Sequence, residues 1–244
     1  MPETSKTADQ ALALLTAVSE YQPVTAGELC RRLSMNRTIA YRLLATLHQR
    51  GFVRRAGERY VLGPAVAHLV SRVEPALRDA ARPVMRQLCA EVGETVVLQV
   101  VDGDQAVILD QVIARQHVVR VEQNLIARHP LLAGASGRVL LAHQPPRARE
   151  RLLARLARPE QVASLAADLA RIRRTGYETS RDELQLGVHA IAAPVSGADG
   201  TVIAALTILI PVGRAGRIIE HRDALIEAAR EIRVSPEAAE ATGG

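Results

Sequence analysis

Arginine side chains gather between residues 31 and 59. This segment holds eight arginines and one acidic residue, Glu58, so its net charge is +7, while the whole chain carries +5. A guanidinium group is planar and permanently charged, and it can donate two parallel hydrogen bonds to a phosphate or to a guanine base. The chemistry that this segment favours is the binding of a polyanion.

Capping residues mark the elements that must position these arginines. Thr25 followed by Glu28 is a capping box, which predicts the start of a short helix, and Asn36 can cap a second helix. Gly51 is a natural stop for the second helix, and residues 52–62 predict two short strands around a turn. The apolar residues of the second helix recur at helical spacing and are Ala40, Leu43, Leu44 and Leu47.

Two helices joined by a short turn and followed by an arginine-tipped hairpin predict a winged helix-turn-helix, whose second helix enters the major groove of double-stranded DNA. A solvated basic face on an ordinary helical hairpin is the alternative interpretation. On the outward face of the second helix, the candidates for contacts with phosphates and base edges are Arg37, Thr38, Tyr41 and Arg42. Around the wing, the candidates for contacts with the DNA backbone or minor groove are Arg54, Arg55 and Arg59.

The charge excess belongs to the beginning of the chain. Residues 1–75 carry ten basic and six acidic side chains, and residues 76–244 carry twenty-one and twenty. Cys30 and Cys89 both fall at apolar positions of predicted helices, which argues against a disulfide. Neither a leader peptide nor a bilayer-spanning run is recognisable, so we expect a cytoplasmic protein without a membrane partner.

The rest of the chain mixes helices with hairpins. Strands are predicted at 95–101, 105–113, 117–122, 189–196 and 201–210. Helices are predicted at 5–21, 65–73, 76–92, 147–156, 159–174 and 218–232, with a further helix after a turn of small residues at 134–137. Hairpins with helices grouped between and after them predict an α+β fold on an antiparallel sheet. The expected domains are a winged helix-turn-helix at 1–63, a linker helix at 64–75, a sheet domain at 76–235 and a flexible tail at 236–244.

A ligand site is predicted where Gly134-Ala135-Ser136-Gly137 begins a helix, because the free N–H groups there favour an anion or a carbonyl oxygen. The residues expected to wall this site are Leu131, Leu132, His189, Ala190, Thr207 and Leu209. Asp182 and Glu183 are expected to select a hydroxyl or an amine of the ligand. In the alternative interpretation, Gly134 and Gly137 only permit tight helix packing and Thr207 only satisfies the sheet edge.

Catalytic chemistry is not indicated. The seven histidines are scattered, without the spacing of a metal site, and the serine in the small-residue turn has no assignable base. We therefore expect neither an enzyme nor a cofactor or metal.

Several separated motifs resemble the IclR-type transcriptional regulators. They are RLSMNRTIAYRLLATLHQRGFVRRAGERYVLG, then VGETVVLQVVDGDQAVILDQV and RHPLLAGASGRVLLAH, and finally RRTGYETSRDELQLGVHAIAAPVSGADGTVIAALTILIP. The resemblance covers roughly residues 8 to 233. It implies a winged helix, a linker helix and a GAF-like C-terminal domain that binds a small effector, assembled as homodimers or homotetramers on DNA.

The sequence thus predicts a ligand-responsive transcriptional regulator, expected to be a repressor, that senses a small metabolite such as an organic acid. Binding of this effector is expected to alter the spacing of the paired DNA-binding domains. In the alternative hypothesis, the C-terminal domain of the DNA-binding regulator serves only oligomerisation.

Overall fold

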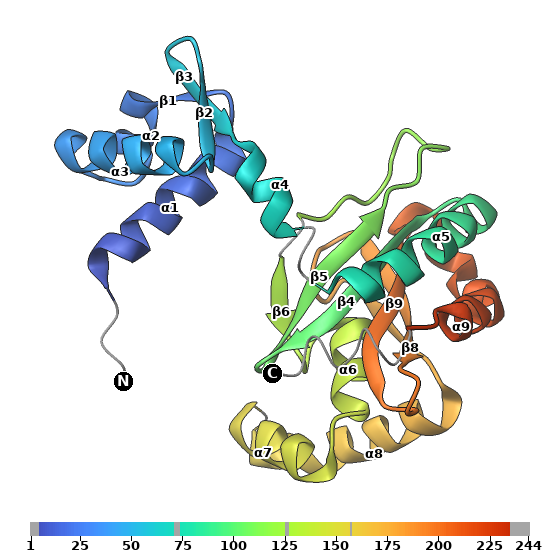
Figure 1. Ribbon diagram of the computed structural model, residues 1–244. Coiled ribbons are helices and arrows are strands. Elements are labelled where there is room, and N and C mark those ends of the chain that lie inside the picture. Colours follow the sequence, from blue (N-terminus) through green and yellow to red (C-terminus); the bar gives the residue numbers. More distant parts are fainter. Residues whose placement is uncertain (1–4, 71–73, 125–126, 157, 235–244) are drawn as a thin grey trace. The chain divides into compact units, whose positions relative to one another are not determined.

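The computed structural model describes residues 5–70, 74–124, 127–156 and 158–234 (Figure 1). The chain divides into two compact units, Met1–Val73 and Glu74–Gly244. The division lies beside Pro75, at the end of the predicted linker helix. The predicted tail at 236–244 lies outside the described residues.

The first unit combines helices with a small antiparallel sheet. Its elements are α1 (Lys6–Tyr21), β1 (Val24–Thr25), α2 (Ala26–Arg32), α3 (Arg37–Gln49), β2 (Val53–Ala56), β3 (Arg59–Leu62) and α4 (Pro64–Val70). The sheet order is β1-β3-β2. Leu14, Leu29 and Leu44 are fully buried between the helices, and Tyr60 packs with them from the wing. This aliphatic core holds α2 and α3 in a helix-turn-helix.

Local hydrogen bonds explain where α2 and α3 begin. The Thr25 backbone N–H donates to Glu28 Oε2 at 2.8 Å, and the Glu28 backbone N–H donates to Thr25 Oγ1 at 3.2 Å, which completes the predicted capping box. The Thr38 backbone N–H donates to Asn36 Oδ1 at 2.8 Å. The turn between the two helices passes through Ser34 at a φ of 48°. The cap at Asn36 therefore sets the residue at which α3 begins, and hence which side chains face outward.

The second unit is built on a six-stranded sheet in which each neighbouring pair is antiparallel, in the order β6-β5-β4-β9-β8-β7. The strands are β4 (Thr95–Asp102), β5 (Gln105–Val112), β6 (Arg128–Pro130), β7 (Glu178–Arg181), β8 (Val188–Ser196) and β9 (Val202–Pro211). The helices are α5 (Pro75–Val92), α6 (Gly134–Ala142), α7 (Pro146–Leu156), α8 (Pro159–Thr175), the 3-10 helix η1 (Val212–His221) and α9 (Arg222–Glu231). The predicted α+β class is thereby confirmed.

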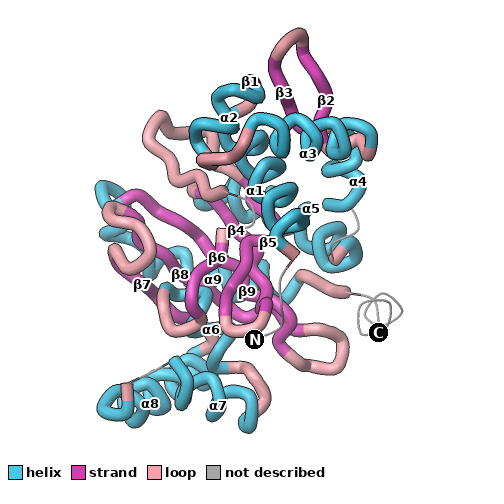
Figure 2. The backbone as a smooth tube through the Cα atoms, turned by 90° about the vertical axis from the view of Figure 1, so that its left-hand side faces the viewer, coloured by secondary structure: helices cyan, strands magenta, loops and turns pink. Residues whose placement is uncertain are grey.

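Alternate residues of the central strands face two separate cores. Ile191 and Ala193 of β8 pack with α5 and α9 on one face of the sheet, while Ala190 and Ala192 pack with α6 and α8 on the other. This alternation follows from the two-residue period of a strand. Figure 2 shows α7 and α8 side by side at the end of the unit away from α5. The small residues of β8 leave space beneath α6.

Three sequence predictions differ from the structure. The strand predicted at 117–122 is wrong, because these residues lie in a loop whose Val118 and Val119 side chains are 96% and 66% exposed. Alternating valines form a strand when one face is buried, whereas of these three valines only Val121 is buried, at 5% exposed. Strands β6 and β7 were not predicted. The helix predicted at 218–232 is instead the end of η1 followed by α9.

Candidate functional site

The outward face of α3 brings together the four residues predicted to contact DNA. Arg37, Thr38, Tyr41 and Arg42 are all exposed, with Tyr41 at 51%, while Ala40 on the opposite face is buried. Within the described part of the chain, the guanidinium groups of Arg37 and Arg42 have no hydrogen-bond or ion-pair partner. They are therefore free to meet phosphate oxygens or base edges.

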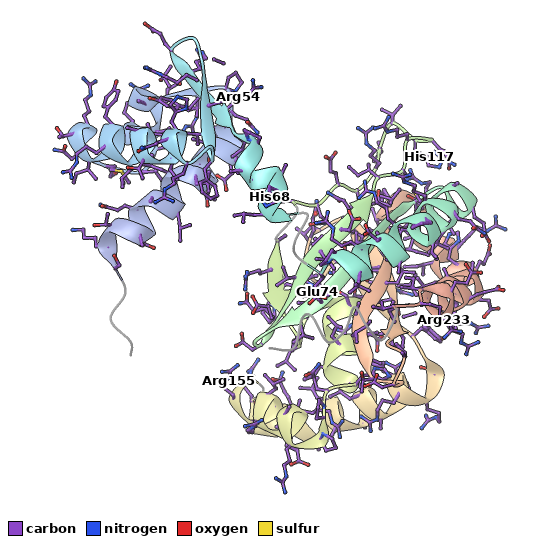
Figure 3. All side chains as sticks on the ribbon, in the orientation of Figure 1. Arg54, His68, Glu74, His117, Arg155 and Arg233 are labelled. Atoms are coloured by element: carbon purple, nitrogen blue, oxygen red, sulfur yellow. The ribbon has the colours of Figure 1, made fainter. Side chains whose placement is uncertain are left out.

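The three wing arginines are exposed but differ in their contacts. Arg54, labelled in Figure 3, has no partner among the described residues. The Arg55 guanidinium lies 5.6 Å from the centroid of the Tyr60 ring. Arg59 Nη1 donates to the Pro23 carbonyl at 2.9 Å and lies 3.7 Å from Glu28 Oε2. Arg59 thus ties the wing to the start of α2, whereas Arg54 is the wing cation with the fewest internal contacts.

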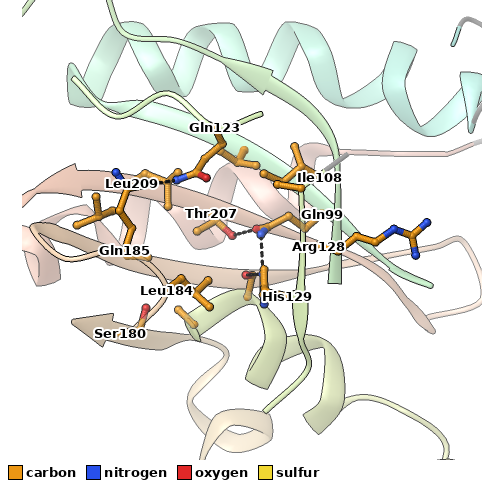
Figure 4. Close-up of a pocket in the computed structure, with 16 residues that line it drawn as sticks. Gln99, Ile108, Gln123, Arg128, His129, Ser180, Leu184, Gln185, Thr207 and Leu209 are labelled. Carbon is orange, nitrogen blue, oxygen red and sulfur yellow. Dashed lines mark hydrogen bonds between the residues drawn. The ribbon is translucent and has the colours of Figure 1, made fainter. Parts of the chain in front are cut away.

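A cavity of about 180 Å³ lies between the sheet and α6 in the second unit (Figure 4). Its walls come from all six strands of the sheet and from α6, and the loop at 182–187 contributes Leu184 and Gln185. The predicted ligand-site residues that line this cavity are Ala135, Ser136, Ala190, Thr207 and Leu209. The start of α6 and strands β8 and β9, which the sequence assigned to one site, therefore meet at this cavity.

The backbone cradle predicted at the start of α6 is occupied by a side chain of the protein itself. The Gly134 backbone N–H donates to Glu183 Oε2 at 2.9 Å, and Arg138 donates to both carboxylate oxygens at 2.6 and 2.9 Å. Burial raises the pKa of Glu183, but the bonds from Arg138 and Gly134 outweigh it and hold this pKa below its ordinary value. Glu183 therefore serves as an anionic cap for α6 and does not line the cavity.

The other predicted ligand-site residues lie outside the cavity as well. Leu131 and Leu132 pack in the core beneath α6. Gly137 approaches the backbone so closely that a Cβ there would lie 2.9 Å from the Pro130 carbonyl oxygen, so it serves helix packing. Asp182 Oδ2 lies 3.4 Å from His189 Nε2. His189 borders a separate depression beside η1.

Hydrogen bonds join polar side chains at one wall of the cavity (Figure 4). Thr207 Oγ1 donates to Gln99 Oε1 at 2.8 Å, and Gln99 Nε2 lies 3.1 Å from His129 Nε2. Ser136 Oγ lies 3.2 Å from the same ring nitrogen. Burial lowers the pKa of His129, and bonds to the Pro130 and Ala133 backbone offset this only in part. The wall thus offers neutral hydrogen-bonding groups.

The remaining lining is mostly apolar. Val97, Ile108, Val188 and Leu209 contribute aliphatic surface from four different strands. An aliphatic chamber with a polar wall suits a small amphipathic molecule, since its apolar part replaces water and its polar part selects the orientation.

Comparison with known proteins decides the family. The family model described as "Bacterial transcriptional regulator IclR C-terminal" matches residues 68–234, and the one described as "IclR helix-turn-helix domain" matches residues 7–57. The chain belongs to the IclR family of bacterial transcriptional regulators. The first unit is accordingly the DNA-binding part of this IclR-family regulator.

Relatives and solved structures agree with this assignment. The HTH-type transcriptional regulator BhcR of Paracoccus denitrificans is 32% identical over 238 residues, covering 92% of this chain and 85% of that protein. The transcriptional repressor IclR of Escherichia coli is 30% identical over 241 residues, covering 92% and 87%. The crystal structure of Thermotoga maritima IclR superposes with a TM-score of 0.75 at 26% identity, covering 93% and 96%. An IclR homolog from Microbacterium hydrocarbonoxydans, complexed with 4-hydroxybenzoate, shares the fold with a TM-score of 0.76 at 24% identity, covering 97% and 100%.

The relatives are named as regulators of transcription, a function that involves no catalysis, so this IclR-family chain is not assigned an enzymatic activity. Within the described ranges, no group of three or more His, Cys, Asp or Glu side chains could hold a metal ion. None of the helices described is long and apolar enough to cross a membrane.

Eleven of the sixteen residues that line the cavity escaped the sequence prediction. Those with a polar side chain but no fixed charge are Gln99, Gln123, His129, Ser180 and Gln185. For Gln99, the run TVVLQVV did contain a clue, because a single polar residue inside an apolar strand needs a buried partner. The other four lie near loops or edge strands, and their approach to the cavity depends on tertiary packing.

Proposed function

We propose that this IclR-family regulator is a repressor whose second unit binds a small organic acid and whose operator affinity changes on binding. The observation that carries the proposal is the cavity of about 180 Å³ with a hydrogen-bonded polar wall. Pockets for drug-sized ligands span about 300–1,000 Å³, so a small metabolite fits this site better. The first unit supplies the DNA contacts, through the exposed face of α3 and the wing.

We also propose that residues 64–75 form a linker and that the protein assembles into homodimers or homotetramers. Symmetric oligomers place two copies of a DNA-binding unit on two half-sites, and this is how most helix-turn-helix regulators reach adequate specificity. A ligand that changes the relation between the copies would change operator affinity.

One observation favours the alternative that the second unit serves only oligomerisation. The free N–H group of Gly134, predicted to receive a ligand, is already bonded to Glu183. The bond removes one anion site but leaves the polar wall at Gln99 and Thr207 in contact with the cavity. The ligand-responsive function therefore remains the better supported of the two.

Gel-shift titration tests the proposal. The operator is first selected from random DNA, and binding is then measured with acetate, benzoate and 4-hydroxybenzoate, the last chosen because a homolog of the same fold was solved with it. Ala190→Leu should fill part of the cavity and abolish the response, because Ala190 lines it and is buried. The matched control is Leu186→Ala on the exposed loop, which should respond like the wild type. If a ligand changes the operator affinity of Ala190→Leu as much as that of the wild type, the cavity is not the ligand site.

A further inference from the structure

We propose that His129 recognises the anionic group of the ligand, and that binding of this anion is coupled to uptake of a proton by the imidazole ring. The inference rests on the proposed function and adds the charge of the ligand and the pH dependence of its binding. It starts from the charges of the cavity lining.

The cavity lining offers no unpaired permanent cation. Arg128 is the lining residue with a fixed positive charge, and its Nη1 lies 2.6 Å from Asp102 Oδ2. Figure 4 shows the Arg128 side chain extending away from the other labelled residues. An anion placed in this cavity would therefore meet neutral donors unless a neutral group becomes charged. His129 is the lining residue whose ordinary pKa allows this near pH 7.

The geometry of the ring assigns its proton. His129 Nδ1 lies 3.2 Å from the Pro130 carbonyl oxygen, which can only accept, so Nδ1 carries the hydrogen. Nε2 is then the bare acceptor, and it faces Gln99 Nε2 at 3.1 Å and Ser136 Oγ at 3.2 Å. A second proton would bind at Nε2, after which the ring becomes a donor and the Gln99 amide N–H can no longer bond to it. An anionic oxygen at this position would accept the new N–H.

The charged groups on the elements around His129 pair with one another, which leaves a bound anion as the group that can raise the pKa of His129. On β4, β5 and the turn between them, Asp102 pairs with Arg128, Asp104 with Arg155 at 2.8 Å, and Asp110 with Arg82 at 2.7 Å. On α6 and the loop at 182–187, Arg138 pairs with Glu183, and Asp182 faces His189. Strand β9 carries no ionisable side chain. Burial is the largest influence on the pKa of His129 and lowers it, so the ring is neutral at pH 7 in the absence of an anion.

The direction of the coupling follows from linkage. Without ligand, burial holds the pKa of His129 below its ordinary value, and this pKa rises when an anion bonds to Nε2. Between these two pKa values the complex holds one proton more than the free protein does, so affinity falls as the pH rises. Within this interval the dissociation constant increases by up to about tenfold per pH unit, and above the pKa of the complex it becomes independent of pH.

Calorimetry at several pH values tests the coupling in the full-length protein. Acetate, benzoate and 4-hydroxybenzoate serve as anionic probes and benzamide as a neutral one, each titrated in phosphate and in Tris because the two buffers differ in ionisation enthalpy. We expect a carboxylate to bind with uptake of close to one proton, and its affinity should weaken several-fold, at most about tenfold, per pH unit between pH 6.5 and 8. Benzamide should show neither effect.

Two histidine variants separate the site from other titrating groups. His129→Gln keeps a hydrogen-bonding side chain but cannot take up the proton, so carboxylate affinity should become flat with pH. His189→Gln changes a histidine outside the cavity and should behave like the wild type. NMR of the His129 ring nitrogens in the wild type gives a readout that needs no variant, since the free ring should be the Nδ1–H tautomer and the complex doubly protonated.

Each failure has a distinct meaning. Carboxylate binding without proton uptake, or with the same pH dependence in His129→Gln, would overturn the role of His129 while leaving the ligand-responsive function intact. Binding of neutral compounds alone would overturn both the role of His129 and the organic acid as ligand, and would leave only the response to a small molecule. The absence of binding by any probe at the cavity would contradict both proposals.

Discussion

At the scale of single residues, the second unit buries polar side chains and satisfies all of them. Gln99, Ser136 and Thr207 are at most 5% exposed, and no buried side-chain nitrogen or oxygen of the described residues lacks a hydrogen-bond partner. A ligand that enters the cavity must therefore exchange one of these bonds for its own. Because a buried group left unpaired costs about 1–3 kcal/mol, the polar wall favours ligands that restore the bond and rejects those that cannot.

The exposed arginines of α3 lead to a prediction at the same scale. Arg42→Ala should weaken operator binding by about 1–3 kcal/mol if the guanidinium bonds to a base, because it has no partner within the described protein. The melting temperature should be unchanged, since the side chain is exposed. Gel-shift titration and calorimetry check both statements. Arg147→Ala, an exposed arginine of α7, is the control, and equal operator affinity in the two variants would dismiss the assigned contact.

A second residue-scale prediction concerns the acidic cap of α6. The pKa of Glu183 is lowered in the folded state, so its carboxylate stabilises the protein above the ordinary value of 4.5, and this contribution is lost as the pH falls through the folded pKa. Glu183→Gln should therefore destabilise the protein at pH 7, on the order of 1 kcal/mol given its partial exposure, and should differ less from the wild type near pH 3.

Calorimetric melting curves at both pH values measure this difference. Glu160→Gln is the control, because Glu160 makes a longer ion pair of 3.9 Å on the surface. A Glu183 variant that differs from the wild type equally at both pH values would show that the ionised carboxylate is not the source of the stability.

At the scale of elements, the sequence predicts helices with caps and tight hairpins well. The capping box at Thr25 and the cap at Asn36 are local, and so is the Asp-Gly-Asp turn between β4 and β5. Strand β6 was missed because it has three residues, and its pairing partner β5 lies more than fifteen residues earlier in the chain. The cavity was found only in part for a similar reason. Local signals identified the start of α6 and strands β8 and β9, but the positions of His129 and Gln99 relative to them arise from the sheet order.

A prediction for α2 follows from its cap. Thr25→Ala removes the hydroxyl that accepts the Glu28 N–H, and this should cost about 1 kcal/mol of stability in the first unit. Thr16→Ala, at an exposed interior position of α1, should be neutral or slightly stabilising, because alanine has the higher helix propensity. Calorimetry gives the melting temperatures of the wild type and of the two variants. Equal melting temperatures for the Thr25 and Thr16 variants would mean that the tertiary core, and not the cap, fixes the start of α2.

At the scale of the whole molecule, the excess positive charge lies in the first unit and the cavity lies in the second. Ten basic and six acidic side chains lie in residues 1–75, whereas the remaining residues are almost balanced. The DNA-binding part can therefore meet a polyanion, while the sheet unit encloses a cavity with mostly aliphatic walls. Arg37, Thr38, Tyr41 and Arg42 are the exposed side chains of α3 proposed to contact bases, so we expect a single copy to read a few base pairs at most.

The small reading surface predicts that the regulator binds its operator as a symmetric assembly. Specific sites are bound about 4–10 kcal/mol more tightly than random DNA, and one base contact supplies about 1–3 kcal/mol, so a second copy that doubles the contacts brings the upper part of this range within reach. An operator selected from random DNA should contain two related half-sites. Light scattering should give at least a dimer in solution.

Inserting five base pairs between the half-sites turns them to opposite faces of the DNA helix and should weaken binding strongly. Inserting ten base pairs returns them to the same face and should restore binding. A single half-site bound as tightly as the full operator would show that one copy suffices, and the spacing of paired domains could then not carry the response to the ligand.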